Sequence, residues 1–180
     1  MNRSSQTAAS PATALATSAG EPAAVRGGVH WRTVLGVFKL RISVLIMATA
    51  LGGLFIVPEG SVAPLQALVL ALSVLLASAS AGAFNQFVEA DSDRLMARTR
   101  SRAFASGALP RSFGWLLAIV ALLVFAVSMA AWVVNLTAAG FVLLGALTYA
   151  GVYTLGLKRR TPWNIVIGGL AGSFAVLAGA

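Results

Sequence analysis

The chain has no cysteine, a single histidine and only five acidic residues. Without cysteine it forms no disulfide, zinc–thiolate site or iron–sulfur cluster. One histidine cannot make a metal site alone, and we interpret His30, beside Trp31 and Arg32, as an interfacial side chain without a special role. Charge is scarce as well, because 10% of the residues are charged whereas 58% are hydrophobic. This composition excludes most soluble folds.

Long apolar runs recur after residue 40 until the chain ends. A transmembrane helix needs about 20 mostly apolar residues. We predict five such helices, at residues 42–57, 62–88, 113–134, 137–157 and 164–180, with a tight turn at Asn135. The sequence therefore predicts an all-α integral membrane protein.

The first 28 residues differ from the rest of the chain. They are rich in alanine, serine, threonine and proline, lack aromatic residues, and contain no apolar run long enough for a signal peptide. We predict a disordered tail over residues 1–28, followed by a membrane domain over residues 29–180. A mitochondrial transit peptide is the alternative for the tail, but its arginines are few and no amphipathic stripe is evident.

The basic residues predict the topology. In a soluble protein the net charge of +8 would indicate nucleic-acid binding, but here the distribution of the charges decides. All 13 lysines and arginines precede the first predicted helix or lie in the loops after the second and fourth helices. Because basic residues of short loops stay on the cytoplasmic side, we predict a cytoplasmic N-terminus and no nucleic-acid partner. We expect a bacterial cell (inner) membrane, with the mitochondrial inner membrane as the alternative.

Three of the five acidic residues, Glu89, Asp91 and Asp93, lie close together at the end of the second predicted helix. Asn85, Glu89 and Asp93 are four residues apart and therefore stack on one helix face, whereas Asp91 points the other way. Their oxygen atoms suit Mg²⁺, which binds to one or two carboxylates together with water and phosphate oxygens. The helix macrodipole adds negative charge at this end. The pattern predicts a magnesium site that receives a diphosphate.

A solvated loop is the alternative interpretation, in which the acidic residues pair with Arg94, Arg98 and Arg100. Arginines at this position also satisfy the positive-inside rule whatever the function. Arginine is nevertheless a bidentate phosphate ligand, and positive charge lowers the barrier to the departure of a diphosphate. Both interpretations of the arginines can hold together.

Two stretches resemble a known family. NQFVEADSD, residues 85–93, with the basic segment 96–102 and Ser106-Gly107 after it, resembles the first aspartate-rich motif of the UbiA-type intramembrane prenyltransferases. YTLGLKRRTPWNIVIGG, residues 153–169, resembles a stretch typical of the haem O synthases within that family. Lys39-Leu40-Arg41 is also similar to the family's Lys-Pro-Arg segment. The resemblance covers about residues 36–172.

The resemblance implies a nine-helix α-bundle around a central cavity. It implies the transfer of a farnesyl group from farnesyl diphosphate to the vinyl group of protohaem IX (haem B), with water added, to give haem O. Mg²⁺ would be the cofactor of this step in haem biosynthesis. A haem A synthase or oxidase-assembly proteins would be the partners.

The resemblance also implies roles for individual residues. The catalytic metal and diphosphate ligands would be Asn85, Glu89 and Asp93, with Asp91 as a further metal ligand, and the diphosphate contacts would be Arg98, Arg102, Lys158 and Arg159. The chain departs from the family pattern at Leu40, Ala103 and Ala105, where prolines are common, and at Glu89, where aspartate is usual.

The chain stops in the fifth predicted helix, before the family's second aspartate-rich motif. We therefore expect the N-terminal part of a longer enzyme, inactive alone. A non-catalytic membrane protein of the same fold is one alternative, but transporters place acidic residues near the bilayer midplane rather than at one helix end. A quinone precursor or chlorophyllide as acceptor is another alternative, against which residues 153–169 argue.

Overall fold

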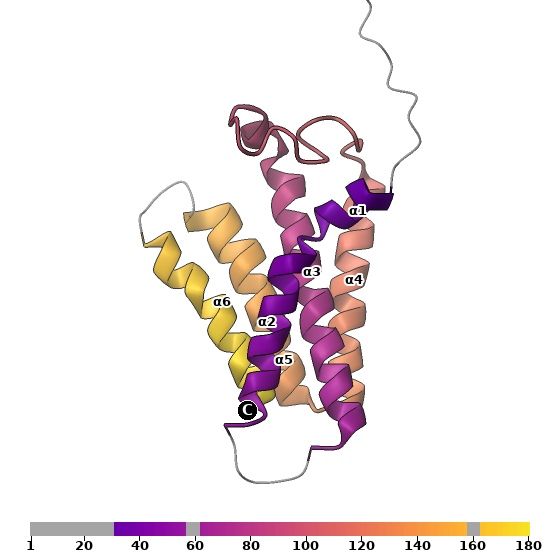
Figure 1. The fold of residues 1–180 in the computed structure, drawn as a ribbon, viewed down its shortest axis with the longest axis vertical. Coiled ribbons are helices and arrows are strands. Elements are labelled where there is room, and N and C mark those ends of the chain that lie inside the picture. Colours follow the sequence, from indigo (N-terminus) through magenta and orange to yellow (C-terminus); the bar gives the residue numbers. More distant parts are fainter. Residues whose placement is uncertain (1–30, 57–61, 158–162) are drawn as a thin grey trace, which may run out of the picture.

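The computed structural model describes residues 31–56, 62–157 and 163–180. In these ranges helix is the only regular secondary structure, which confirms the all-α prediction (Figure 1). The elements are α1 (Trp31–Val37), α2 (Leu40–Gly53), α3 (Pro64–Arg94), α4 (Phe113–Val133), α5 (Leu136–Leu147), the π-helix η2 (Thr148–Leu157) and α6 (Asn164–Gly179). The predicted tail, His30, Lys158 and Arg159 lie outside the described residues.

Three helices are long and apolar enough to cross a membrane, namely α3, α4 and the continuous helix Leu136–Gly156 formed by α5 and η2. A fourth span results if α1 and α2 are counted together, although the two are bent by 48°. The fifth predicted span corresponds to α6, whose 16 residues are fewer than a bilayer core requires. The described chain is a membrane protein with three spans by length and composition, or four with the bent pair.

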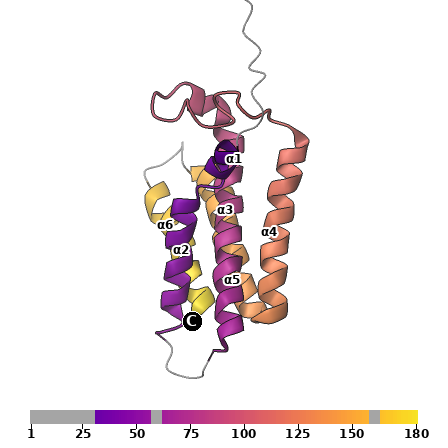
Figure 2. The same cartoon turned by 45° about the vertical axis from the view of Figure 1, so that its right-hand side comes forward.

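Helix α3 lies at the centre of the bundle. Of its apolar stretch 61% is buried, against 17% for α4 and 22% for the helix Leu136–Gly156. In both views α4 lies on one side of α3 and α6 on the other (Figure 2). The buried residues of α3 are mostly alanine, serine and glycine, and small side chains let neighbouring helix backbones approach closely. The sequence of α3 therefore suits a helix that has neighbours on several sides.

The backbones of α2 and α6 cross in close contact. A Cβ atom at Gly53 would collide with the carbonyl oxygen of Val176, and one at Gly179 would collide with that of Ala50. Glycine at these two positions therefore allows the backbones to touch. This crossing fixes α6 beside α2 at the end of the bundle opposite to the one at which α3 ends.

The turn between α4 and α5 confirms the prediction at Asn135. Its side-chain Oδ1 accepts a hydrogen bond from the backbone N–H of Ala138 at 2.7 Å, which caps α5. The two helices are joined with almost no loop, so α5 returns directly alongside α4.

The end of the bundle at which α3 stops is called the Asp93 end here. It gathers α1, the first turn of α2, the loop 95–112 and the beginning of α4 (Figure 1). The loop is anchored by Phe104 and Leu109, which are 1% and 2% exposed. The Phe104 ring makes edge-to-face contacts with Phe87 of α3 and Trp115 of α4 at centroid distances of 5.5 and 5.6 Å. The loop is therefore packed as part of the core.

Candidate functional site

The last turns of α3 present one buried polar face. Because α3 remains helical to Arg94, Asn85, Glu89 and Asp93 stack as their four-residue spacing predicts. They are 1%, 5% and 4% exposed, which is unusual for acidic side chains and costs free energy unless partners compensate. We refer to these three residues as the polar face of α3.

Asn85 connects three elements. Its Oδ1 accepts a hydrogen bond from Lys39 Nζ, at the start of α2, at 2.7 Å. Its Nδ2 donates to Thr154 Oγ1 of η2 at 3.2 Å, and that hydroxyl donates in turn to the carbonyl oxygen of Tyr149 at 2.8 Å. The acceptor lies five residues before Thr154, which is the spacing of a π-helix. Asn85 is thus held by a cation on one side and a hydroxyl on the other.

Asp93 pairs with Arg102 of the loop 95–112. Arg102 Nη1 lies 2.7 Å from Asp93 Oδ2, and the side chains are 24% and 6% exposed. Thr99 Oγ1 also donates to the backbone carbonyl of Asp93 at 3.1 Å, which holds the loop against the end of α3. A largely buried, charge-assisted contact of this kind is stronger than a surface ion pair. Of the residues predicted to contact diphosphate, Arg102 is brought to the polar face.

The other predicted residues are placed differently. Asp91 lies on the opposite side of α3, with 72% of its side chain exposed, and pairs with Arg111 at 2.7 Å and more loosely with Arg94 at 3.9 Å. The structure therefore does not bring Asp91 to the polar face, because a regular helix turns it away. Arg98 is exposed and makes no ion pair within the described ranges.

The alternative of a solvated acidic loop fits only Asp91. Its partners are Arg111 and Arg94, whereas the alternative names Arg94, Arg98 and Arg100. Glu89 and Asp93 are buried instead, whereas Asp91, which lies between them in the sequence, is exposed.

The polar face offers oxygen atoms but not a complete metal cage. In the described part of the chain, no three acidic or histidine side chains come close enough to hold a metal ion together. Two carboxylates and an amide oxygen remain, and Mg²⁺ is commonly held by one or two carboxylates plus water and phosphate oxygens. This donor set fits a magnesium ion that a phosphorylated ligand helps to hold.

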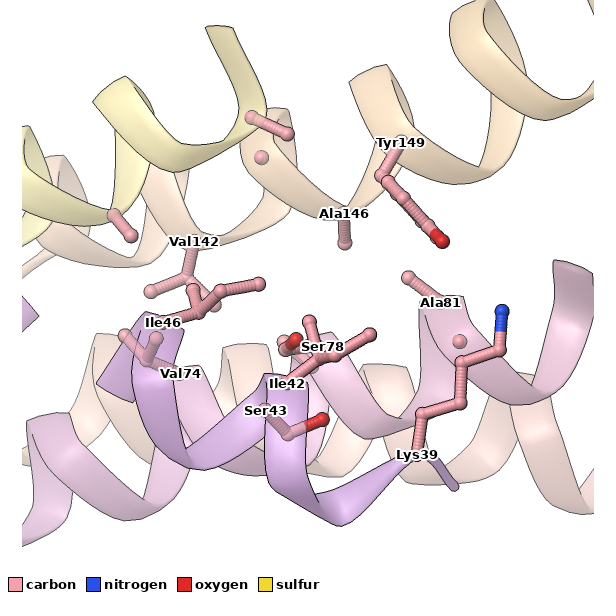
Figure 3. Close-up of a pocket in the computed structure, with 15 residues that line it drawn as sticks. Lys39, Ile42, Ser43, Ile46, Val74, Ser78, Ala81, Val142, Ala146 and Tyr149 are labelled. Carbon is pink, nitrogen blue, oxygen red and sulfur yellow. The ribbon is translucent and has the colours of Figure 1, made fainter. Parts of the chain in front are cut away.

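Two hollows meet at Lys39, the lysine that contacts Asn85, and Lys39 and Ile42 line both. The first is an apolar cavity of about 60 Å³ between α2, α3, α5 and α6. Figure 3 shows Lys39 and Tyr149 at one end of it and Ile46, Val74 and Val142 at the other. The second is an open hollow of about 610 Å³ at the Asp93 end. Lys39, which contacts Asn85, thus borders an apolar space and a basic one.

Sequence reasoning did not assign Lys39 and Thr154 to the site. Both lie in the stretches that resemble the family, yet their contacts with Asn85 span 46 and 69 positions along the chain. Helical periodicity reaches only a few residues and cannot pair such distant positions. The segment Lys39-Leu40-Arg41 and the stretch 153–169 contain these two residues, but neither stretch indicates a contact with Asn85.

Comparisons with known proteins identify the family of the chain. Residues 46–180 match the UbiA prenyltransferase family. The chain is 52% identical over 152 residues to protoheme IX farnesyltransferase 2 of Paramagnetospirillum magneticum, covering 83% of this chain and 52% of that protein. It is 39% identical over 166 residues to protoheme IX farnesyltransferase of Rhizorhabdus wittichii, covering 90% and 53%.

A third relative, protoheme IX farnesyltransferase of Methylococcus capsulatus, is 40% identical over 161 residues, which cover 87% of this chain and 51% of the relative. The chain therefore spans about half the length of these curated relatives. No solved structure matches it. Since the family match covers three quarters of the residues, the chain belongs to the UbiA prenyltransferase family.

Proposed function

We propose that the chain forms the diphosphate-binding part of a haem O synthase, which transfers a farnesyl group from farnesyl diphosphate to the vinyl group of protohaem IX. The names of the relatives support the reaction. The observation that carries the proposal for the site is the buried polar face of α3 with Lys39 and Arg102 against it. Buried acidic groups in a membrane protein usually mark a substrate or ion site.

The reaction breaks the bond between farnesyl C1 and the diphosphate oxygen, and the diphosphate leaves with the electron pair. The vinyl π electrons of protohaem IX form the new carbon–carbon bond to C1. Water then adds to the electron-deficient vinyl carbon with loss of a proton, which gives haem O. Charge must therefore be stabilised first on the departing diphosphate.

Glu89 and Asp93, with the amide oxygen of Asn85, would hold Mg²⁺, which supplies a Lewis acid for the diphosphate oxygens. Lys39 and Arg102 supply fixed positive charge beside the same oxygens, at 2.7 Å from Asn85 and Asp93 respectively. Either cation can donate to a phosphate oxygen bound at the face. Arg98, Lys158 and Arg159 remain proposed diphosphate contacts, and the exposed Asp91 is the weakest of the proposed metal ligands.

The orientation of the protein in the membrane follows from the positions of its basic residues. In the described ranges every lysine and arginine lies at or near the Asp93 end, which supports a cytoplasmic location for that end and for the N-terminus. Farnesyl diphosphate would then enter from the cytoplasm, with its chain in the bilayer. A bacterial inner membrane is proposed, with the mitochondrial inner membrane as the alternative, and a haem A synthase or oxidase-assembly proteins as partners.

The identity of the molecule that accepts the farnesyl group is tested with the full-length protein, which is purified in detergent and supplied with farnesyl diphosphate and Mg²⁺. Protohaem IX and 4-hydroxybenzoate are offered separately, and products are identified by mass. Haem O alone supports the proposal. A prenylated benzoate moves the chain to another branch of the family, and the absence of both products favours the non-catalytic alternative.

A further inference from the structure

The open hollow at the Asp93 end shares Lys39 and Arg102 with the proposed diphosphate site and extends beyond them to α1. Its wall is formed by α1, the first turn of α2, one side chain of α3 and three residues of the loop. The lining residues are Arg32, Thr33, Gly36, Lys39, Ile42, Gln86, Ser101, Arg102 and Ala103. Its volume of about 610 Å³ lies within the range of about 300–1,000 Å³ typical of ligand pockets, whereas the apolar cavity of about 60 Å³ does not.

The charges of the hollow favour an anionic ligand. Three of its lining residues are cationic and none is acidic. Lys39 and Arg102 already contact Asn85 and Asp93, but Arg32 makes no ion pair among the described residues and instead lies 5.4 Å from the Trp31 ring centroid. A concave surface with an excess of one charge concentrates ligands of the opposite charge. Arg32 is the cation of the hollow that the polar face does not use.

The wall that carries Arg32 is held in place. Gln86 Nε2 donates to the carbonyl oxygens of Gly36 and Val37, both at 3.0 Å, and so ties the end of α1 to α3. Val37 is fully buried beneath this contact. Lys39, with a φ of 46°, turns the chain between α1 and α2. The position of Arg32 relative to the polar face is therefore set by the fold.

If the proposed function holds, the second substrate supplies such an anion. Protohaem IX carries two propionate carboxylates on the edge of the ring away from its vinyl groups. A flat molecule with that edge in the hollow would have its other edge directed toward the polar face, since Arg102 and Lys39 border both. We infer that the hollow is the acceptor site and that Arg32 binds a propionate carboxylate of protohaem IX.

The test compares the full-length enzyme with Arg32→Gln, using haem O formation with protohaem IX and with its dimethyl ester. Losing one charge-assisted contact should raise the KM for protohaem IX about tenfold and leave the KM for farnesyl diphosphate unchanged. With the dimethyl ester, which has no carboxylate, wild type and variant should have equal KM values. Arg100→Gln is the matched control, because it removes an exposed arginine of the loop 95–112 that does not line the hollow, and it should not change any of these values.

Other results would overturn the inference. An unchanged KM for protohaem IX, or an equal effect on the ester, would show that Arg32 does not bind propionate. A raised KM for farnesyl diphosphate would assign the hollow to the diphosphate. In phosphatidylcholine vesicles with and without phosphatidylglycerol, an effect of Arg32→Gln seen only with the anionic lipid would assign it to a lipid headgroup. Failure of the wild type to make haem O would instead refute the proposed function.

Arg32→Lys separates binding from folding. It keeps the charge but loses the bidentate geometry, so the KM for protohaem IX should lie between those of wild type and Arg32→Gln. A raised KM of the lysine variant for the dimethyl ester, which has no carboxylate to bind, would point to a structural role of Arg32 and contradict the inference.

Discussion

At the scale of single residues, the contacts of Asn85 are the feature that sequence spacing could not supply. Helical periodicity correctly predicted that Asn85, Glu89 and Asp93 share a face, because that relation is local to α3. The partners Lys39 and Thr154 come from other helices, so only tertiary packing reveals them. Asp91 was grouped with the metal ligands through its nearness in sequence, although helix geometry alone turns it away.

Thr154→Val tests the contact with η2. The change removes the hydroxyl that accepts from Asn85 Nδ2, and leaves a buried amide donor without that partner. We expect the free energy of unfolding to fall by about 1–3 kcal/mol, measured as a lower midpoint of thermal denaturation in detergent. Thr137→Val, at an exposed position of α5, is the control and should leave the midpoint unchanged. Equal midpoints for both variants would contradict the hydrogen bond between Asn85 and Thr154.

At the scale of elements, the sequence predicted the helices but not their irregularities. Apolar runs correctly predict α3, α4 and the helix Leu136–Gly156, because a membrane-spanning helix can be recognised from its composition and length alone. The bend at Lys39 and the π-helix η2 have no comparable signal, since neither changes the apolar pattern. The single span predicted at 42–57 is consequently a helix that begins at Leu40, with the short α1 at an angle before it.

The crossing of α2 and α6 can be tested with neighbouring glycines. At Gly53 a methyl group would collide with the backbone of α6, so Gly53→Ala should destabilise the protein by about 1–3 kcal/mol. At Gly52 a methyl group would meet no atom within 4 Å. Gly52→Ala should therefore be neutral or stabilise by up to about 1 kcal/mol. Thermal denaturation of the full-length protein measures both, and equal shifts would rule out the close crossing.

The loop 95–112 depends on Phe104. Phe104→Ala removes a ring that is 1% exposed and contacts two other aromatic rings, at a cost of about 3–5 kcal/mol to local packing. Hydrogen exchange of the loop amides should accelerate by at least about 100-fold, because the loop opens more often. Leu95→Ala, at an 88% exposed position, should leave exchange unchanged. Unchanged exchange in the Phe104 variant would mean that other contacts hold the loop.

At the scale of the whole molecule, charge distribution predicts the orientation. The chain contains no cysteine, so single cysteines report on each end when the full-length protein is made cysteine-free. Ser106→Cys lies in the loop at the Asp93 end and Val62→Cys at the opposite end, and both positions are exposed. In intact cells an impermeant maleimide should label only the cysteine at position 62. The reverse labelling would invert the proposed topology.

The chain spans about half the length of its curated relatives, and the polar face supplies two carboxylates and an amide oxygen. Composition and motifs predicted both the family and the membrane location, because these depend on local sequence.

We propose that the buried polar face of α3 carries the chemistry, and one comparison of acidic variants tests this proposal most directly. Haem O formation by the full-length protein is measured for wild type, Asp93→Asn and Asp91→Asn at saturating Mg²⁺. Asp93 is buried against Arg102 whereas Asp91 is exposed on the opposite side, two residues away. We predict a loss of at least about 100-fold for Asp93→Asn and less than about threefold for Asp91→Asn. Equal losses for the two variants, or a greater loss for Asp91→Asn, would contradict the account.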